Sequence, residues 1–183
     1  MTSSQFTQTN SPQELIDVVD KHDVVVSQAS RKEVHDKKLL HREVAVLIYD
    51  DQNRILTQQR SSKKKVMPLY WIISVAGHVP AGMTPEEAAH KELIEELGFD
   101  TELSLYTKEL LDYGFENHFA YGYIGKISEG TVPVVDKNEI EQIRFASRAD
   151  LEEMLKEGEQ IEEYSLRDFQ KFFAGEFDRF LKQ

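Results

Sequence analysis

One helix with defined ends constrains this chain more than any other feature. Residues 84–98 read Thr-Pro-Glu-Glu-Ala-Ala-His-Lys-Glu-Leu-Ile-Glu-Glu-Leu-Gly. Thr84 is a good N-cap, Pro85 stands where a missing N–H costs nothing, and Glu87 completes a capping box. Gly98 supplies the left-handed residue that commonly ends a helix. The sequence therefore predicts a helix whose start and end are both set by local chemistry.

The predicted helix carries its carboxylates on one side. At about 100° per residue, one arc holds the apolar side chains of Ala89, Leu93, Ile94 and Leu97. A second arc holds three carboxylates, those of Glu92, Glu95 and Glu96. Like charges at this spacing destabilise an isolated helix, and only Lys91 lies near enough to offset them. A divalent cation that prefers oxygen ligands, Mg²⁺ or Mn²⁺, would resolve the conflict, and a solvated acidic surface is the alternative interpretation.

Composition excludes several chemistries. The chain contains no cysteine, so it has no disulfide scaffold, no thiolate metal site and no thiol nucleophile. Its 183 residues include 22 basic and 33 acidic side chains, a net charge of −11. This balance argues against stable nucleic-acid binding, which depends on Lys and Arg at the phosphates. A hydrophobic content of 40% is sufficient for one globular core.

No targeting or membrane segment is evident in the sequence. The longest apolar runs, Val44–Tyr49 and Trp71–Ala76, are far shorter than the roughly 18 residues of a membrane helix. The N-terminus is polar and lacks the basic region of a signal peptide. We therefore expect a cytoplasmic protein with no membrane partner, in which residues 1–13 form a flexible tail and residues 14–183 form a single domain.

Strands outnumber helices in the rest of the chain. Apolar and alternating runs predict strands over 15–19, 24–28, 44–49, 54–60, 70–75, 103–111 and 119–127, with residues 138–145 leading into a helix. That helix opens at Ser147-x-x-Asp150 and closes at Gly158, and residues 32–38 form a short helical or irregular segment. A last helix begins near Ser165, with phenylalanines at helical spacing: Phe169, Phe173, Phe177 and Phe180. The pattern indicates a mixed α/β or α+β sandwich.

Residues 77–99 resemble the Nudix box. The matching positions are Gly77, Glu92, Leu93, Glu95, Glu96, Gly98 and Phe99, whereas Met83 replaces the first Glu of the pattern and Lys91 replaces its Arg. The resemblance implies the Nudix fold, a mixed β-sheet sandwiched between helices (α/β/α). It also implies hydrolysis of a small-molecule diphosphate with Mg²⁺ or Mn²⁺ as cofactor. The expected metal-binding and catalytic residues are Glu92, Glu95 and Glu96.

The resemblance extends to the isopentenyl-diphosphate isomerase branch of that family. It rests on residues 40–42, 58–61, 71–78 and 116–117, together with the Lys63–Lys65 cluster. In that isomerase a catalytic Cys immediately precedes the Gly-His pair, and here the position is Ala76. Because a methyl group can neither donate nor accept a proton, the resemblance favours hydrolysis over isomerisation.

Further candidate site residues lie outside the helix. His41 and His78 match metal-binding histidines of the isomerase, although a hydrogen-bonded packing role is the alternative for each. Glu139 falls near the isomerase's catalytic Glu and is a candidate general base, with solvated charge as the alternative. The expected substrate-binding residues are Arg60, Lys63, Lys64, Gly77 and His78, with the basic side chains holding phosphates.

The sequence thus favours a metal-dependent Nudix-type diphosphatase acting on a nucleoside diphosphate derivative or a related organic diphosphate. Two alternatives remain open at this point. One is an isomerase, which Ala76 disfavours, and the other is a non-catalytic nucleotide-binding sensor, which Met83 and Lys91 favour. Family members often pair, so the resemblance also implies a homodimer.

Overall fold

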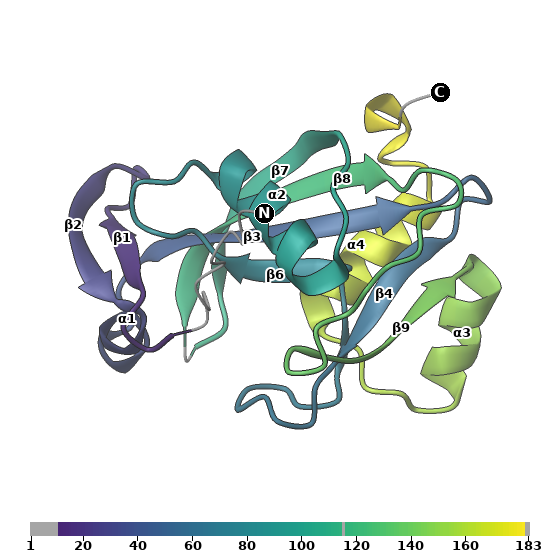
Figure 1. Ribbon diagram of the computed structural model, residues 1–183, viewed down its shortest axis with the longest axis horizontal. Helices are drawn as coiled ribbons and strands as arrows, with labels where there is room; N and C mark the ends of the chain where they lie inside the picture. The colour runs from purple at the N-terminus through teal and green to yellow at the C-terminus, as the bar shows by residue number, and fades with distance from the viewer. Residues whose placement is uncertain (1–10, 115, 182–183) are drawn as a thin grey trace, which may run out of the picture.

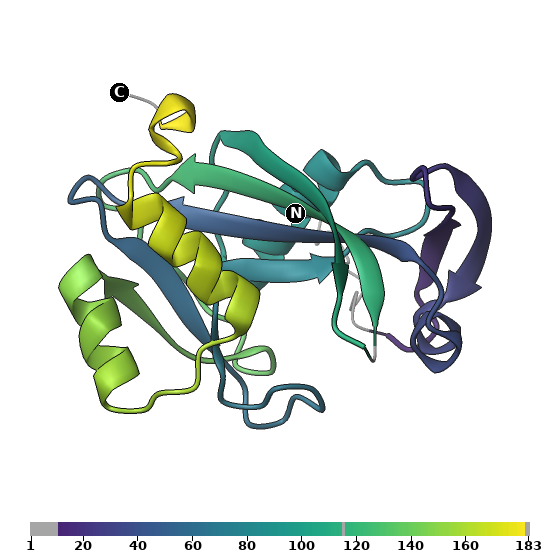
Figure 2. The same cartoon turned by 180° about the vertical axis from the view of Figure 1, so that it is seen from behind.

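A mixed sheet lies between helices in the computed structural model, which describes residues 11–114 and 116–181. Helix α2 (Pro85–Leu97) covers one face of the sheet (Figure 1), and α4 (Glu163–Phe173) covers the other (Figure 2). The predicted α/β architecture with helices on both faces is confirmed. The first ten residues of the predicted tail lie outside the described residues. No helix among the described residues is long and apolar enough to cross a membrane.

Within the described residues the main sheet has seven strands. They are β3 (His41–Tyr49), β4 (Ile55–Arg60), β5 (Trp71–Ile72), β6 (Val75–His78), β7 (Leu103–Asp112), β8 (Asn117–Lys126) and β9 (Ile140–Ala146). The order is β5-β4-β3-β8-β7, with β6 paired to β3 and β9 paired to β4. Strands β3 and β8 run parallel, and the other pairs are antiparallel. The central strand β3 therefore contacts three neighbours.

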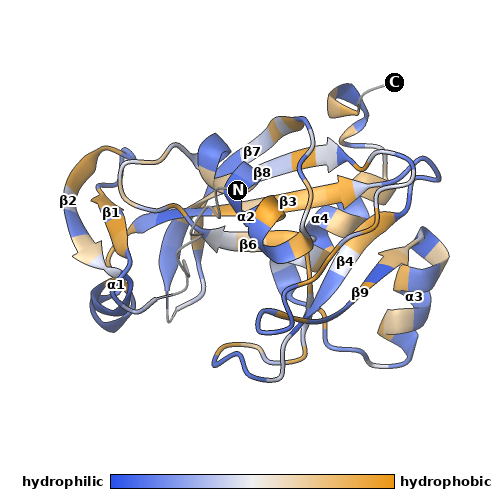
Figure 3. Cartoon of the chain, viewed as in Figure 1, coloured by the Kyte–Doolittle hydropathy of each residue, from blue (hydrophilic) through white to orange (hydrophobic). Residues whose placement is uncertain are grey.

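The alternation of side chains along β3 divides the core into two layers. Val44, Val46 and Ile48 face α2, where they pack in one cluster with Leu93 and Leu97. Burial of each such side chain contributes about 1.5–3 kcal/mol. Leu47 and Tyr49 point to the opposite face and join a second cluster around α4, and Figure 3 shows the hydrophobic colouring along β3. Helix α3 (Arg148–Lys156) packs beside α4 on this second cluster.

Both ends of α2 form as the sequence predicts. The Thr84 Oγ1 accepts a hydrogen bond from the Glu87 backbone N–H at 3.2 Å, and the Glu87 carboxylate accepts one from the Thr84 N–H at 2.8 Å. Gly98 ends the helix at φ 74°. Ile94, which shares the apolar arc with Ala89, Leu93 and Leu97, is 42% exposed, whereas those three are buried. The helix instead buries two of its carboxylates, described below.

Two predicted elements differ in their extent. The strand expected over 70–75 is broken into β5 and β6, because the buried Ser74 hydroxyl bonds the β3 backbone at Ile48 and the Leu56 carbonyl on β4 instead of continuing a ladder. The last helix begins at Glu163 and ends at Phe173. The helical spacing of the later phenylalanines was therefore misleading, although Phe177 still packs in the same cluster.

The N-terminal segment forms a separate two-stranded sheet. The predicted hairpin is present as β1 (Leu15–Val19) and β2 (Val25–Ser30), followed by α1 (Arg31–Lys37). Its small core contains Ile16 and Val34. This unit lies at one end of the main sheet (Figure 1), where α1 closes one side of the cavity described below.

Asp23, in the β1–β2 turn, ties the hairpin to the main sheet. Its carboxylate accepts hydrogen bonds from Arg42 Nε at 2.6 Å and from the Tyr121 hydroxyl, and it pairs with Lys108 Nζ at 2.6 Å. Partial burial acts to raise the pKa of Asp23, but the hydrogen bonds from Lys108, Tyr121 and Arg42 outweigh it and hold the pKa below its ordinary value. The ionised carboxylate therefore stabilises the folded state.

We expect Asp23→Asn to lower the free energy of unfolding by about 1–2 kcal/mol, because it removes the charge from three hydrogen bonds. Since the folded pKa is depressed, the wild-type advantage is full above the ordinary pKa of 3.8 and shrinks as the pH falls below it. Urea denaturation at several pH values measures the difference. The control is Asp51→Asn, which disrupts an exposed ion pair with Lys126 and should change little. An equal effect of both substitutions would contradict this role of Asp23.

Candidate active site and metal centre

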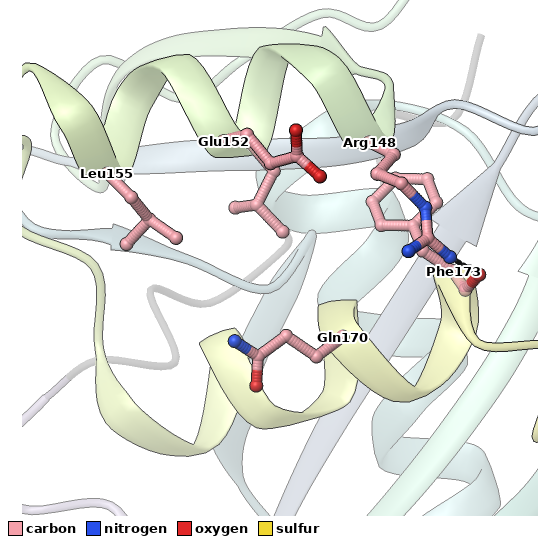
Figure 4. Close-up of a pocket in the computed structure, with 6 residues that line it drawn as sticks. Arg148, Glu152, Leu155, Gln170 and Phe173 are labelled. Atoms are coloured by element: carbon pink, nitrogen blue, oxygen red, sulfur yellow. Dashed lines mark hydrogen bonds between the residues drawn. The ribbon is translucent and has the colours of Figure 1, made fainter.

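Two pockets of different character lie near α4. The larger, of about 890 Å³, is bounded by α1, the loop after β4, the sheet and the start of α4, and it contains buried ionisable groups. The smaller, of about 210 Å³, lies between α3 and α4, where Arg148 donates to the Phe173 carbonyl (Figure 4). The two share no lining residue. The large cavity is the candidate active site because the predicted residues converge on it.

Two of the three predicted helix carboxylates are buried beside the sheet. Glu92 lies against Gly77, where an added Cβ would be 2.6 Å from the Glu92 Cδ, so any side chain at position 77 would displace this carboxylate. Glu96 accepts a hydrogen bond of 2.9 Å from Gln58 Nε2 on β4. Burial raises the pKa of Glu92 to about 7 and that of Glu96 to about 8. A cation between these carboxylates would relieve their repulsion.

The third carboxylate, Glu95, pairs with Lys91, which is one of the two departures from the Nudix box pattern. The other departure is Met83. Lys91 Nζ lies 2.9 Å from Glu95 Oε2 and 3.7 Å from Glu92 Oε1. Lysine therefore supplies a positive charge within the helix, without the planar fork of arginine. Met83 packs against the core cluster beneath α2. Neither departure disturbs the burial of Glu92 and Glu96.

Four side chains, which we call the His/Glu cluster, lie together at the same cavity: His41, Glu43, His78 and Glu116, of which all but His41 line it. One ligand atom from each lies within 4.8 Å of the others, and it is the only such group among the described residues. His41 Nε2 is 3.3 Å from Glu116 Oε1 and 3.7 Å from Glu43 Oε1. His78 Nε2 is 3.2 Å from Glu43 Oε1 and 3.7 Å from Glu116 Oε1.

The donor atoms of the His/Glu cluster fit a cation. His41 Nε2, His78 Nε2 and Glu116 Oε1 are buried and have no hydrogen-bond partner. Buried polar atoms in this state are costly unless a ligand occupies the space between them. The His41 ring is oriented by its Nδ1, which lies 2.8 Å from the Leu39 carbonyl, as is common for metal-binding histidines. Mixed imidazole and carboxylate ligands suit Mn²⁺ or Zn²⁺ better than Mg²⁺.

Electrostatics in the His/Glu cluster favour ionised carboxylates. Burial acts to raise the pKa of Glu116, but the imidazoles of His35, His41 and His78 outweigh it and hold the pKa well below its usual range. Burial acts to lower the pKa of His41, but Glu116 and Glu43 outweigh it and raise the pKa to about 9. For His78, burial prevails and lowers the pKa. Two anionic ligands are therefore available to a cation.

Sequence reasoning missed part of the His/Glu cluster. Glu43 was not considered, and Glu116 entered only through the family resemblance. The available signal was strand alternation, since His41 and Glu43 are two residues apart on β3 and so share a face. The pairings of Glu43 with His78 and of His41 with His118 depend on strand register, which the sequence did not reveal.

The predicted basic residues and Glu139 also reach the large cavity. Its lining includes Arg60, Lys63, Lys64, Gly77, His78, Glu96 and Glu139, but not Glu92 or Glu95. Lys64 is ion-paired with Glu139, and Lys63 Nζ bonds Asn138 at 3.3 Å. Burial lowers the pKa of Arg60. On the opposite side, α1 adds Arg31 and Lys32, which the sequence analysis did not single out.

Comparison with known proteins identifies the family to which the chain is similar. The family model described as NUDIX domain matches residues 39–169. The chain is 29% identical over 139 residues to isopentenyl-diphosphate Delta-isomerase 2 of Photorhabdus laumondii, covering 73% of this chain and 77% of the relative. It is 35% identical over 123 residues to an uncharacterized Nudix hydrolase of Listeria innocua, covering 67% and 72%.

Solved structures are similar in fold. DR0079 from Deinococcus radiodurans superposes with a TM-score of 0.72 at 23% identity, covering 87% of this chain and 99% of that one. The NUDIX domain of Shewanella oneidensis NrtR, solved with ADP ribose, superposes with a TM-score of 0.61 at 11% identity, covering 84% and 100%. At these identities the likeness establishes the fold.

We expect Mn²⁺ or Zn²⁺ to raise the melting temperature of metal-free protein by about 5–10 °C at a hundredfold excess over Kd. Glu43→Gln and His78→Asn should reduce this shift strongly, because each removes a donor from the His/Glu cluster. Thermal melts with and without metal measure the shift.

The matched control is His90→Asn, because His90 pairs with Asp100 on the far side of α2 and is not in the His/Glu cluster. A wild-type shift that survives both cluster substitutions would show that the cation binds elsewhere.

Proposed function

Because the chain belongs to the Nudix family, in its isopentenyl-diphosphate isomerase-like branch, we propose that it is a metal-dependent hydrolase of organic diphosphates. One observation carries the proposal. The buried Glu96, three members of the His/Glu cluster (Glu43, His78 and Glu116) and the basic residues around Arg60 all line a single cavity. A diphosphate is the ligand that needs both cations and cationic side chains in one place.

The chain offers two places for cations. The His/Glu cluster would hold one, and Glu92 with Glu96 would hold another, since Gly77 leaves space for the first carboxylate and Gln58 orients the second. A bound divalent cation supplies charge neutralisation at phosphoryl oxygens and makes water a stronger nucleophile. The remaining work falls to positioning by the chain's own side chains.

Basic side chains would hold the diphosphate on the cavity side opposite α1. Arg60 is suited to bidentate contact with phosphate oxygens, because its guanidinium is planar and is held through its Nε by the Val66 carbonyl at 3.2 Å. Lys64 would act as a point charge, with Glu139 holding its ammonium in place. Phosphoryl transfer depends mainly on such positioning and charge stabilisation.

Two carboxylates that line the cavity are candidates to accept the proton from attacking water. Glu96 has its pKa raised to about 8 by burial, so a nearby cation is needed to keep it ionised near neutral pH. Glu139 directly precedes β9 and is paired with Lys64. We assign acceptance of this proton to Glu96 or Glu139, and the two substitutions described below distinguish between them.

Replacement of Glu96 by Gln should lower kcat about 100-fold or more at saturating Mg²⁺, with a smaller change in KM, because the side chain acts on the transition state. Phosphate or monophosphate release from a panel of nucleoside diphosphates, nucleotide sugars and prenyl diphosphates measures turnover. The control is Glu86→Gln on the exposed side of α2, which should retain wild-type rates. Wild-type hydrolysis by Glu96→Gln would refute the role assigned to this residue.

Glu139→Gln distinguishes the proton acceptor from a metal ligand. If Glu139 accepts the proton, its replacement lowers kcat without weakening Mn²⁺ binding, whereas loss of Glu96 weakens both. Calorimetric titration with Mn²⁺ supplies the second readout. Unchanged kcat in Glu139→Gln would assign proton acceptance to Glu96.

Isomerisation is the second candidate function, because relatives bear that name and the His/Glu cluster lies beside the Gly-His pair. Ala76 stands where the isomerase has its Cys, and its methyl cannot move a proton. Incubation with isopentenyl diphosphate should therefore give no dimethylallyl product, as followed by NMR. Product formation by the wild-type chain would overturn the hydrolase proposal. Tight binding of a nucleotide without phosphate release would instead support a sensor.

A further inference from the structure

Small residues form the floor of the large cavity beside the His/Glu cluster. Ala45 on β3 pairs with Ala76 on β6 and with Gly122 on β8, so three adjacent strands present no side chain larger than a methyl group. A Cβ on Gly122 would lie 2.6 Å from the Tyr106 Cζ, so the Tyr106 ring lies directly over this glycine. We call these three positions the floor.

The floor lies between the His/Glu cluster and the part of α4 that packs in the second core cluster. Ala45 is two residues from Glu43 on β3, and Ala76 is two residues from His78 on β6, a separation of about 7 Å along each strand. Two residues further along β3, Leu47 is already buried against α4. A diphosphate held at the cluster and at Arg60 would therefore direct its organic group over the floor toward the start of α4.

Helix α4 and its N-cap present two buried carboxylates to this space. Glu162 caps the helix and is fully engaged: its oxygens accept from the Tyr113 hydroxyl, the backbone N–H groups of Tyr164 and Ser165, and the Ser165 hydroxyl, at 2.7–3.0 Å. A carboxylate has about four acceptor sites, so this residue has no capacity left for a ligand.

Asp168 is the other carboxylate, and it has acceptor capacity left. It is 5% exposed and lines the cavity. Its Oδ2 accepts from the Tyr106 hydroxyl at 2.5 Å, and its Oδ1 accepts from Arg167 Nε at 3.1 Å. Burial raises the pKa of Tyr106 well above its usual value, so that hydroxyl stays a donor. These contacts occupy two of about four acceptor sites.

The part of the cavity near Asp168 carries net negative charge, whereas the part near Arg60, where phosphate would bind, carries basic side chains. Glu109, Glu162 and Asp168 contribute three negative charges, and Arg167, held by Glu109 at 3.0 Å, contributes one positive charge. Another phosphate would be repelled here. A hydrocarbon would strip water from the free acceptor sites of Asp168 without replacing its hydrogen bonds, which is unfavourable. A group that donates hydrogen bonds satisfies both conditions.

We propose that Asp168 is a specificity-determining residue, which accepts hydrogen bonds from hydroxyl or amino hydrogens on a compact organic group of the diphosphate substrate and so selects against isoprenoid chains. This inference rests on the proposed function, since it concerns the substrate of the same site. It deepens that function by separating prenyl diphosphates from hydroxyl- or amino-bearing diphosphates.

The test compares kcat/KM for a ribose diphosphate ester, a nucleoside diphosphate and isopentenyl diphosphate. The wild type should favour one or both hydrogen-bonding substrates over isopentenyl diphosphate by about 100-fold or more, because a site built around a hydrogen bond strongly rejects an analogue that lacks it. Comparison of the ribose diphosphate ester with the nucleoside diphosphate shows whether sugar hydroxyls or base amino groups donate the hydrogen bonds to Asp168. Asp168→Leu should reduce the preference at least tenfold, mainly by raising KM for the favoured substrate.

Two further variants distinguish a role of Asp168 in substrate recognition from a purely structural role. Tyr106→Phe removes the Tyr106–Asp168 hydrogen bond but keeps the carboxylate, so it should keep the preference. Asp168→Asn keeps the side chain's shape and, if Asp168→Leu fails to fold, should still lower the preference severalfold. A wild-type preference below tenfold, or an equal loss in Tyr106→Phe and Asp168→Leu, would overturn the proposal.

Binding of methylene-bridged analogues keeps this test independent of hydrolysis. If no diphosphate is hydrolysed, the proposed function fails, but calorimetry with uncleavable hydroxyl-bearing and isopentenyl analogues still measures the preference. Tighter binding of the hydroxyl-bearing analogue, weakened by Asp168→Leu, would support Asp168 as the selecting residue. Equal binding of the two analogues by the wild type would refute it.

Discussion

The alternation of side chains along β3 is the constraint on which the site depends. Val44 and Val46 face α2 and bury its apolar side, whereas Glu43 and Ala45 face the opposite layer. A slip of one residue would exchange these sets and place a carboxylate in the core. Because β3 also runs parallel to β8 and antiparallel to β6, the same register brings three neighbouring strands to the His/Glu cluster.

Buried charge links the fold to the chemistry. Glu92 and Glu96 occupy positions on α2 that an ordinary amphipathic helix would fill with apolar residues, and burial raises the pKa of both. Such an arrangement opposes folding unless the charge is compensated. The capped ends of α2 and the apolar contacts of Leu93 and Leu97 stabilise the helix enough to tolerate it. The unfavourable burial of charge therefore lies at Glu92 and Glu96, where a bound cation would compensate it.

The sequence predicted the local features well and the long-range ones poorly. The caps at Thr84 and Gly98 follow from residue chemistry alone, and the structure confirms both. Helical periodicity puts Ile94 on one arc with Leu93 and Leu97, but it does not reveal that Ile94 is exposed while Glu92, which packs against Gly77, is buried. The pairing of Glu43 with His78 and the positions of Asp168 and Tyr106 depend on strand register and on packing between distant elements.

Ala76 connects these observations. At the position that the resemblance matches to the isomerase's catalytic Cys, this chain has a methyl group, which cannot donate a proton and forms part of the floor between the His/Glu cluster and α4. The space over the floor is bordered by Asp168 and Arg167, not by hydrocarbon alone. Under the proposed function the missing thiol and the polar wall are consistent with each other, because neither suits the binding and protonation of an isoprenoid chain. The absence of cysteine and the acidic start of α4 together favour a substrate whose organic group is polar.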